Sequence, residues 1–183
     1  LIENQFLLNI WLNNVPEYAI IFCQLCIINN MISIIFRPII LSVHATGKVK
    51  RVNLINGVIY LLVVPISYFM LKTGFSPVVP FIINILLLIL GSFSNLIILR
   101  EYIPEFSIFK FCKEVLSVCF LIVLISSIIP ISIYCNMEPG FIRFILVSLT
   151  SVITISISTY SIAMNNETRN KLKIFIFSKL RSK

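Results

Sequence analysis

Five long apolar runs, separated by short polar segments, set the strongest limit on how this chain can fold. The runs cover residues 17–43, 54–71, 78–99, 115–134 and 141–164. Each is close to or above the roughly 20 residues that a helix needs to cross a bilayer. The first run is clearly longer than this, so a tilt or a break at Pro38 is expected. Only 12% of the 183 residues are charged, about half of the share found in soluble domains, and 58% are hydrophobic. The surplus apolar surface has to face lipid, so we predict an all-α integral membrane protein with five transmembrane helices.

Two segments flank this predicted bundle of residues 17–164. Residues 1–16 are expected outside the membrane on the periplasmic side, because they are apolar but broken by asparagines, with Trp11 near their end. Residues 165–183 alternate cations with apolar residues, which is typical of a basic helix on an anionic membrane surface. Between the third and fourth spans, residues 100–114 are expected to form a short helix lying in the interface.

Three cations stand close together in the turn of residues 44–53: Lys48, Lys50 and Arg51. Lys and Arg are retained on the cytoplasmic side during membrane insertion, so this turn is predicted to be cytoplasmic. In the five-span arrangement, twelve of the fifteen Lys and Arg residues fall on that side, and two, Lys72 and Arg143, on the other. The chain is therefore predicted to begin outside and to end in the cytoplasm.

The net charge of +8 does not indicate a nucleic-acid partner, because the cations lie in the turns between apolar runs and in the tail. Membrane lipids are the expected neighbours. Cys23 and Cys26 form a C-x-x-C pair inside an apolar run, with no second pair and no nearby His. Since a zinc site needs four convergent ligands, we interpret these cysteines as small buried hydrophobic residues and expect no metal or other cofactor.

Polar side chains within the first span are the candidates for a substrate path. Arg37 is the sharpest, because a guanidinium inside a span costs about 3 kcal/mol even on the milder scales. Its planar donors suit a pyrophosphate or an acidic sugar; alternatively, the side chain reaches the cytoplasmic surface, six residues away at Val43. Gln24, Asn29 and Asn30 share this helix, where they line a sugar path or hydrogen-bond a neighbouring helix.

Acidic side chains are scarce. The chain has no Asp, and its seven Glu residues all lie outside the spans or at their ends. A proton relay within a membrane needs a buried carboxylate or His, so an ion-coupling site is not expected in this part of the protein. No Ser-His-Asp set, Gly-rich phosphate loop or zinc-binding cluster is present in the sequence. We predict no catalytic residues and no enzymatic activity.

Four segments resemble a known family: residues 11–19 (WLNNVPEYA), 45–50 (ATGKVK), 65–74 (PISYFMLKTG) and 166–173 (NETRNKLK). In order and spacing they are similar to the C-terminal half of Wzx-type polysaccharide flippases of the multidrug/oligosaccharidyl-lipid/polysaccharide (MOP) exporter superfamily. The likeness is greatest to members from Bacteroides-like bacteria, and it covers essentially the whole chain. Its most specific part is the ATGK turn followed by a span with a central Pro-x-Ser-Tyr.

The resemblance implies two six-helix lobes around a central cavity, with this chain supplying most of the second lobe. It implies that undecaprenyl-pyrophosphate-linked oligosaccharide is moved across the bacterial inner (cytoplasmic) membrane by alternating access, for O-antigen or capsular polysaccharide biosynthesis. The implied partners are the lipid-linked oligosaccharide and an N-terminal lobe of the same protein. The chain begins at Leu1 without an initiating Met, so we expect it to be the tail part of a longer protein.

Three alternatives stay open from the sequence. A MATE-like drug or cation antiporter of the same superfamily would share the fold but would require a carboxylate in its cavity. A membrane enzyme, such as an O-antigen polymerase or an acyltransferase, would require a large outer loop with Arg, His or Asp, whereas the outer loops here have about six residues. A non-transporting remnant is the third, since half a transporter has no complete cavity.

Overall fold

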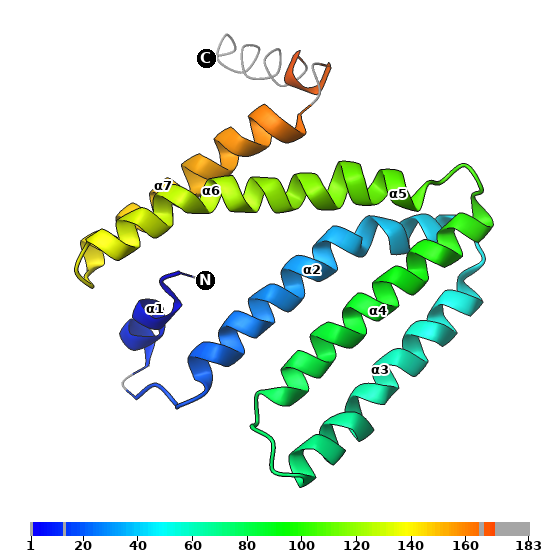
Figure 1. Cartoon of the computed structure of the whole chain (residues 1–183), viewed down its shortest axis with the longest axis horizontal. Helices are drawn as coiled ribbons and strands as arrows, with labels where there is room; N and C mark the ends of the chain where they lie inside the picture. The colour runs from blue at the N-terminus through cyan, green and yellow to red at the C-terminus, as the bar shows by residue number, and fades with distance from the viewer. Residues whose placement is uncertain (1, 13, 165–166, 171–183) are drawn as a thin grey trace, which may run out of the picture. The chain divides into compact units, whose positions relative to one another are not determined.

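The computed structural model describes residues 2–12, 14–164 and 167–170 (Figure 1). In order, its elements are α1 (Asn4–Trp11), α2 (Ala19–Ala45), α3 (Val49–Lys72), α4 (Val79–Tyr102), α5 (Ile108–Phe111), η1 (Cys112–Leu116), α6 (Ser117–Asn136), α7 (Phe141–Ser158) and η2 (Thr159–Ala163). Within the described residues, five helical stretches are long and apolar enough to cross a membrane. The predicted all-α membrane protein with five transmembrane helices is confirmed. Of the predicted basic tail, residues 165–183, the structure describes residues 167–170, which are helical, and the others lie outside the described residues.

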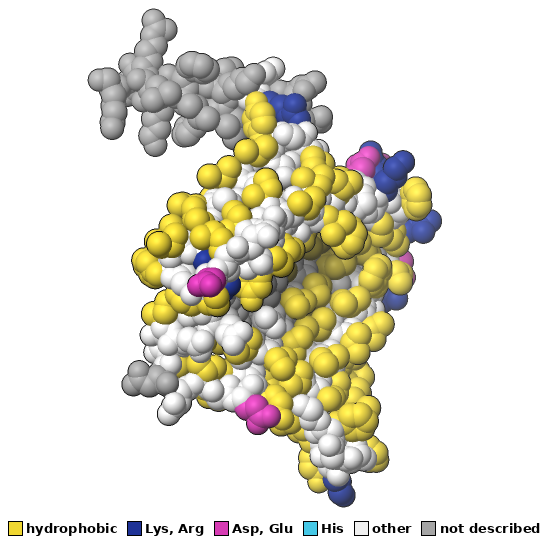
Figure 2. Space-filling model, turned by 60° about the vertical axis from the view of Figure 1, so that its left-hand side comes forward, with side chains coloured by type: hydrophobic (Ala, Val, Ile, Leu, Met, Phe, Trp, Pro, Cys, Tyr) yellow, Lys and Arg dark blue, Asp and Glu magenta, His cyan; other side chains and the backbone are white. Residues whose placement is uncertain are grey.

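The surface of the helices is apolar. Hydrophobic side chains cover most of the helix surface in view, and charged side chains gather near helix ends (Figure 2). Many large aliphatic side chains are mostly exposed, among them Leu61 at 72% and Val64 at 70%. Water does not tolerate apolar surface on this scale, so these side chains face hydrocarbon.

The observed spans differ most from the prediction between the third and the fourth. α4 continues to Tyr102, residues 103–107 form the turn, and the helix that starts at Ile108 runs through α5, η1 and α6 to Asn136. The predicted interfacial helix over residues 100–114 is therefore wrong, and Lys110 and Lys113 belong to the first turns of a membrane helix. Each further residue adds a backbone hydrogen bond, so a helix extends beyond the apolar run that makes it span.

Proline does not interrupt the membrane helices. Pro38, Pro65 and Pro130 lie inside α2, α3 and α6, each of which is continuous. For the first span we expected a tilt or a break at Pro38, and the break is absent. Proline removes one backbone donor from its helix, and membrane helices tolerate this where neighbouring groups satisfy the backbone. Pro80 stands in the first turn of α4, where no donor is lost.

Thr-Gly pairs end both α2 and α3. Thr46 Oγ1 donates to the carbonyl oxygen of Val43 at 2.8 Å, and Thr73 Oγ1 donates to that of Met70 at 2.8 Å. The next residue in each case is a glycine with positive φ, 73° at Gly47 and 88° at Gly74. This left-handed conformation reverses the chain direction at little cost only for glycine. The same two-residue motif therefore forms the turns at both ends of α3.

The chain forms two compact units, residues 3–111 and the residues from Cys112 onward. In the first unit, α4 lies between α2 and α3 (Figure 1) and packs along both. α2 and α4 run in the same direction, because Phe22 stacks on Phe81 with ring centroids 4.7 Å apart, and Phe36 packs against Phe93 further along at 6.0 Å. α2 and α3, although joined by a short turn, are therefore separated by the next helix in the chain.

The core of the first unit lies toward the turn that joins α2 and α3. Val43 and Val52, on either side of this turn, are fully buried, and so is Leu96 near the end of α4. Toward the opposite end of α4, Ile83 is the hydrophobic side chain that is buried among the described residues. The three helices are thus held together most firmly at their basic end.

The second unit is built on the pair α6 and α7. Small side chains face one another between these two helices: Ser126 of α6 and Ser158 of α7 are buried, and Thr154 Oγ1 donates to the Ser126 carbonyl oxygen at 2.9 Å. Small residues let membrane helices approach closely, and their hydroxyls hydrogen-bond across the contact. The pair α6 and α7 is therefore held together by the close approach of the two helix backbones.

Candidate functional site

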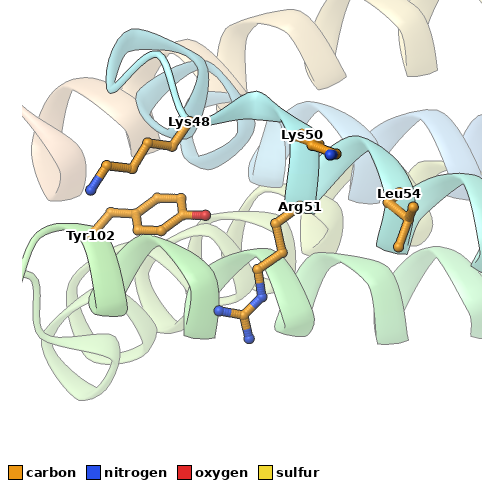
Figure 3. Close-up of a pocket in the computed structure, with 5 residues that line it drawn as sticks. All are labelled: Lys48, Lys50, Arg51, Leu54 and Tyr102. Carbon is orange, nitrogen blue, oxygen red and sulfur yellow. The ribbon is translucent and has the colours of Figure 1, made fainter.

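A shallow pocket opens at the basic end of the first unit. It has a volume of about 470 Å³ and is lined by Lys48, Lys50, Arg51, Leu54 and Tyr102 (Figure 3). Four of these residues come from the start of α3 and the turn before it, and Tyr102 ends α4. The three cations of the turn, predicted from the sequence as a group, are thus gathered around one hollow.

Two contacts with α4 order this basic group. Arg51 extends from α3 toward α4 (Figure 3), where its guanidinium pairs with Glu101; Nη2 donates to Oε1 at 3.4 Å. Lys48 Nζ lies 5.2 Å from the centroid of the Tyr102 ring, within range of a cation–π interaction. The Arg51 and Glu101 side chains are 53% and 44% exposed, so their ion pair is worth about 1 kcal/mol or less.

Lys50 differs from its two neighbours. Its side chain is exposed and forms no hydrogen bond or ion pair within the part of the chain that the structure describes. The pocket lining therefore carries three positive charges, of which that of Arg51 is paired with the Glu101 carboxylate. A surface with this imbalance attracts anions, and Lys and Arg donors suit phosphoryl or carboxylate groups.

Arg37 lies in α2, apart from this pocket. Its side chain is exposed, and it has no hydrogen bond or ion pair with a described residue. Asn30 precedes it by seven residues, or about two helical turns, so both lie on one face of the helix. Phe36 and Ile39, which are buried, occupy a different face of α2. The structure thus presents Arg37 and Asn30 together, outside the packed side of the helix.

The other polar candidates of the first span are separated from one another. Asn29 accepts a hydrogen bond from Asn84 Nδ2 of α4 at 3.3 Å, which joins two membrane helices as expected for an amide in hydrocarbon. Asn30 Nδ2 donates to the Cys26 carbonyl oxygen of its own helix at 2.9 Å. Gln24 is half-buried and precedes Asn29 and Asn30 by five and six residues. Sequence spacing had placed all three on one helix but had not shown that Asn29 faces α4.

Arg143 shows what an arginine with a structural role looks like in this protein. Its side chain is 8% exposed, Nη1 donates to the Met137 carbonyl oxygen at 3.2 Å, and its guanidinium lies 4.5 Å from the Tyr134 ring centroid. These contacts close the turn between α6 and α7. Arg37 has no comparable contacts, so its charge is not explained by packing within the described residues.

Sequence reasoning missed three residues at these sites. Glu101 and Tyr102 complete the basic pocket, and Asn84 is the partner of Asn29. A signal for the first two was present, since an acidic and an aromatic residue at the end of the third span fall on the side of the predicted basic turn. The sequence shows Asn84 as an amide in an apolar run, but it does not show that Asn84 pairs with Asn29.

Neither the comparisons with known proteins nor the positions of possible metal ligands assign a function to this chain. No family model, no curated protein and no solved structure matches this chain. Across the described residues, no three His, Cys, Asp or Glu side chains come together in a way that could hold a metal ion. Cys23 is half-buried and Cys26 exposed, so their interpretation as buried hydrophobic residues is wrong for Cys26.

Proposed function

We propose that this chain is the C-terminal part of a flippase that moves an undecaprenyl-pyrophosphate-linked oligosaccharide across a bacterial inner membrane by alternating access. The five membrane helices and the four segments that resemble Wzx-type flippases support this proposal. The protein acts as a transporter in polysaccharide biosynthesis and not as an enzyme. An N-terminal lobe of the same protein completes the cavity.

Arg37 is the observation on which the proposal rests. A guanidinium on an exposed helix face within a span is costly in hydrocarbon, by about 3 kcal/mol on insertion scales. Water or a protein-lined cavity removes this cost. Arg37 shares its face with Asn30, an amide able to hydrogen-bond a sugar, while its own fork of donors matches a phosphate. This face of α2 is therefore proposed to border the cavity through which the pyrophosphate and the sugars pass.

The remaining parts of the chain have supporting roles in this proposal. The basic turn of residues 44–53 lies in the cytoplasm, and so does the C-terminus, because most cations then fall on the cytoplasmic side. Asn29 holds α2 to α4 through Asn84 and is not on the substrate path. Gln24 remains a path candidate at the outer half of the same helix.

Arg37→Ala in the intact protein tests the proposal. We expect surface polysaccharide to fall about 10-fold, the equivalent of one charge-assisted hydrogen bond, while the protein still inserts and accumulates. Arg100→Ala is the matched control, because Arg100 is an exposed arginine at the end of α4, and this variant should keep normal polysaccharide levels. Normal levels in Arg37→Ala would remove Arg37 from the transport path.

Thiol labelling of the same position separates a watery cavity from lipid. In a cysteine-free background, Arg37→Cys should react with a membrane-impermeant thiol reagent, because only a hydrated thiol forms the reactive thiolate. Leu61→Cys on α3, whose native side chain is 72% exposed, is the lipid-facing control and should stay unlabelled. Equal protection of both cysteines would contradict a cavity at α2.

A further inference from the structure

The basic pocket stands at the point where α3 enters the membrane. Lys48 caps α3, Lys50 and Arg51 lie in its first turn, and the apolar face of the helix begins with Leu54. Tyr102, on the opposite wall, is a residue type enriched at membrane–water interfaces. With Glu101 included, the charges around the pocket sum to +2. The hollow thus combines positive charge with apolar lining at the end of a membrane helix, where lipid headgroups are expected.

An exposed apolar row continues from the pocket along α3. Lys50, Leu54, Val58 and Leu61 follow one another at helical spacing and share one face. Leu54, Val58 and Leu61 are 63%, 52% and 72% exposed. The helix rises about 16 Å from Lys50 to Leu61, which is close to half of a hydrocarbon core of about 30 Å. The row is therefore long enough to accompany one acyl chain through one leaflet.

We propose that this pocket binds the phosphoryl headgroup of an anionic phospholipid, with an acyl chain lying along Leu54, Val58 and Leu61. Lys50 supplies the cation that has no partner within the described residues. Lys48, held over the Tyr102 ring, supplies the second. The charge selects an anionic headgroup, and the apolar row selects a lipid over a free phosphate. This proposal does not depend on the proposed transport.

Glu101 regulates the strength of this site. Its carboxylate occupies the Arg51 guanidinium, which would otherwise offer two parallel donors to a phosphate. The pair is about half exposed, so the carboxylate holds Arg51 only weakly. Removing the charge of Glu101 frees Arg51 and also removes a negative charge beside the pocket. Glu101→Gln is therefore expected to bind the phospholipid more tightly.

Lipid binding to the purified full chain, measured by native mass spectrometry, tests the proposal. Phosphatidylglycerol and phosphatidylcholine with identical acyl chains are titrated into detergent-solubilised protein. Lys50→Ala should weaken phosphatidylglycerol binding about fivefold, the effect of one cation near an anionic lipid surface, and leave phosphatidylcholine unchanged. Lys72→Ala is the matched control, an exposed lysine at the other end of α3, and should have no effect. Glu101→Gln should tighten phosphatidylglycerol binding.

Two further arms distinguish the sources of the phosphoryl group. Glycerol 3-phosphate at millimolar concentration should not displace the lipid, and dihexanoyl phosphatidylglycerol should bind more weakly than the long-chain lipid. Displacement by glycerol 3-phosphate, or equal binding of the short and long lipids, would overturn a lipid site in favour of a free anion. Equal losses in Lys50→Ala and Lys72→Ala, or no preference for phosphatidylglycerol, would overturn the site altogether.

Discussion

Polar residues in the membrane helices have different roles according to the face on which they lie. Arg143 and Asn29 are held by partners, the first at the turn between α6 and α7 and the second on α4. Arg37 and Asn30 lie away from the packed side of α2. An amide or guanidinium in an apolar run therefore indicates function only when packing does not already account for it.

Asn95 is a polar residue that is buried in the core although its side-chain oxygen, Oδ1, has no hydrogen-bond partner among the described residues. It lies in α4 and is 2% exposed. Replacing an unpaired acceptor by an apolar group of similar shape removes a desolvation cost, so Asn95→Leu should leave the free energy of unfolding unchanged or raise it by about 1 kcal/mol. Circular dichroism during denaturant titration in mixed micelles measures this.

The neighbouring residue supplies the comparison for Asn95. Leu96 is fully buried in the same helix. Because lipid tails are as apolar as leucine, transferring the Leu96 side chain from lipid into the core contributes little to stability. Leu96→Ala should therefore lower the free energy of unfolding mainly through the cavity that it leaves, by about 2 kcal/mol. If Asn95→Leu lowered the free energy of unfolding by as much as Leu96→Ala does, the Asn95 amide would have a structural or functional partner.

At the scale of elements, α4 holds the first unit together. It packs along both α2 and α3, and close approach to α3 depends on Gly91. A Cβ atom at Gly91 would meet Asn56 Oδ1 at 3.4 Å and Ile59 Cδ1 at 3.6 Å, so there is room for a methyl group but not for a longer side chain. Small residues are what membrane helices use to approach one another in this way.

Gly91→Leu should therefore separate α3 from α4. Overpacking a close contact costs about 1–3 kcal/mol, and we expect the free energy of unfolding in mixed micelles to fall by that amount. Gly57→Leu is the matched control, because a Cβ atom at Gly57 of α3 would meet nothing within 4 Å. Equal stability of the two variants would show that the α3–α4 contact does not depend on close approach at Gly91.

For the molecule as a whole, the side of the membrane on which each turn lies follows from charge. The turns that begin and end α3 have the same Thr-Gly geometry, yet the first carries three cations and the second only Lys72. Local structure therefore cannot orient the protein, whereas the distribution of Lys and Arg can. The cytoplasmic assignment of residues 44–53 is a prediction of this rule.

Reporter fusions check this orientation. A reporter active only in the periplasm should be inactive when fused after Gly47 and active when fused after Gly74, because the single helix α3 lies between these positions. The two insertion sites share their backbone conformation, so a difference reports their location. Activity after Gly47 would reverse the topology and contradict the resemblance to inner-membrane flippases.

Much of the fold was predictable, whereas the candidate sites were predictable only in part. The five spans, the grouping of three cations in the first turn and the position of Arg37 within a span follow from the sequence. The interfacial helix and the break at Pro38 were predicted but are absent from the structure, and the partners Asn84, Glu101 and Tyr102 were not predicted. Partners lie 50 or more residues apart along the chain, and a helical pattern places side chains only on their own helix.

The sequence by itself determined that this chain spans a membrane five times, because the transfer of each apolar segment into lipid depends on that segment alone. Only the tertiary structure decided that α4 lies between α2 and α3 and that Lys48, Lys50, Arg51 and Tyr102 surround one pocket. In hydrocarbon, a leucine facing lipid and a leucine facing another helix are equally apolar. The hydrophobic pattern therefore carries no information about which faces pack, and small residues and shape decide it.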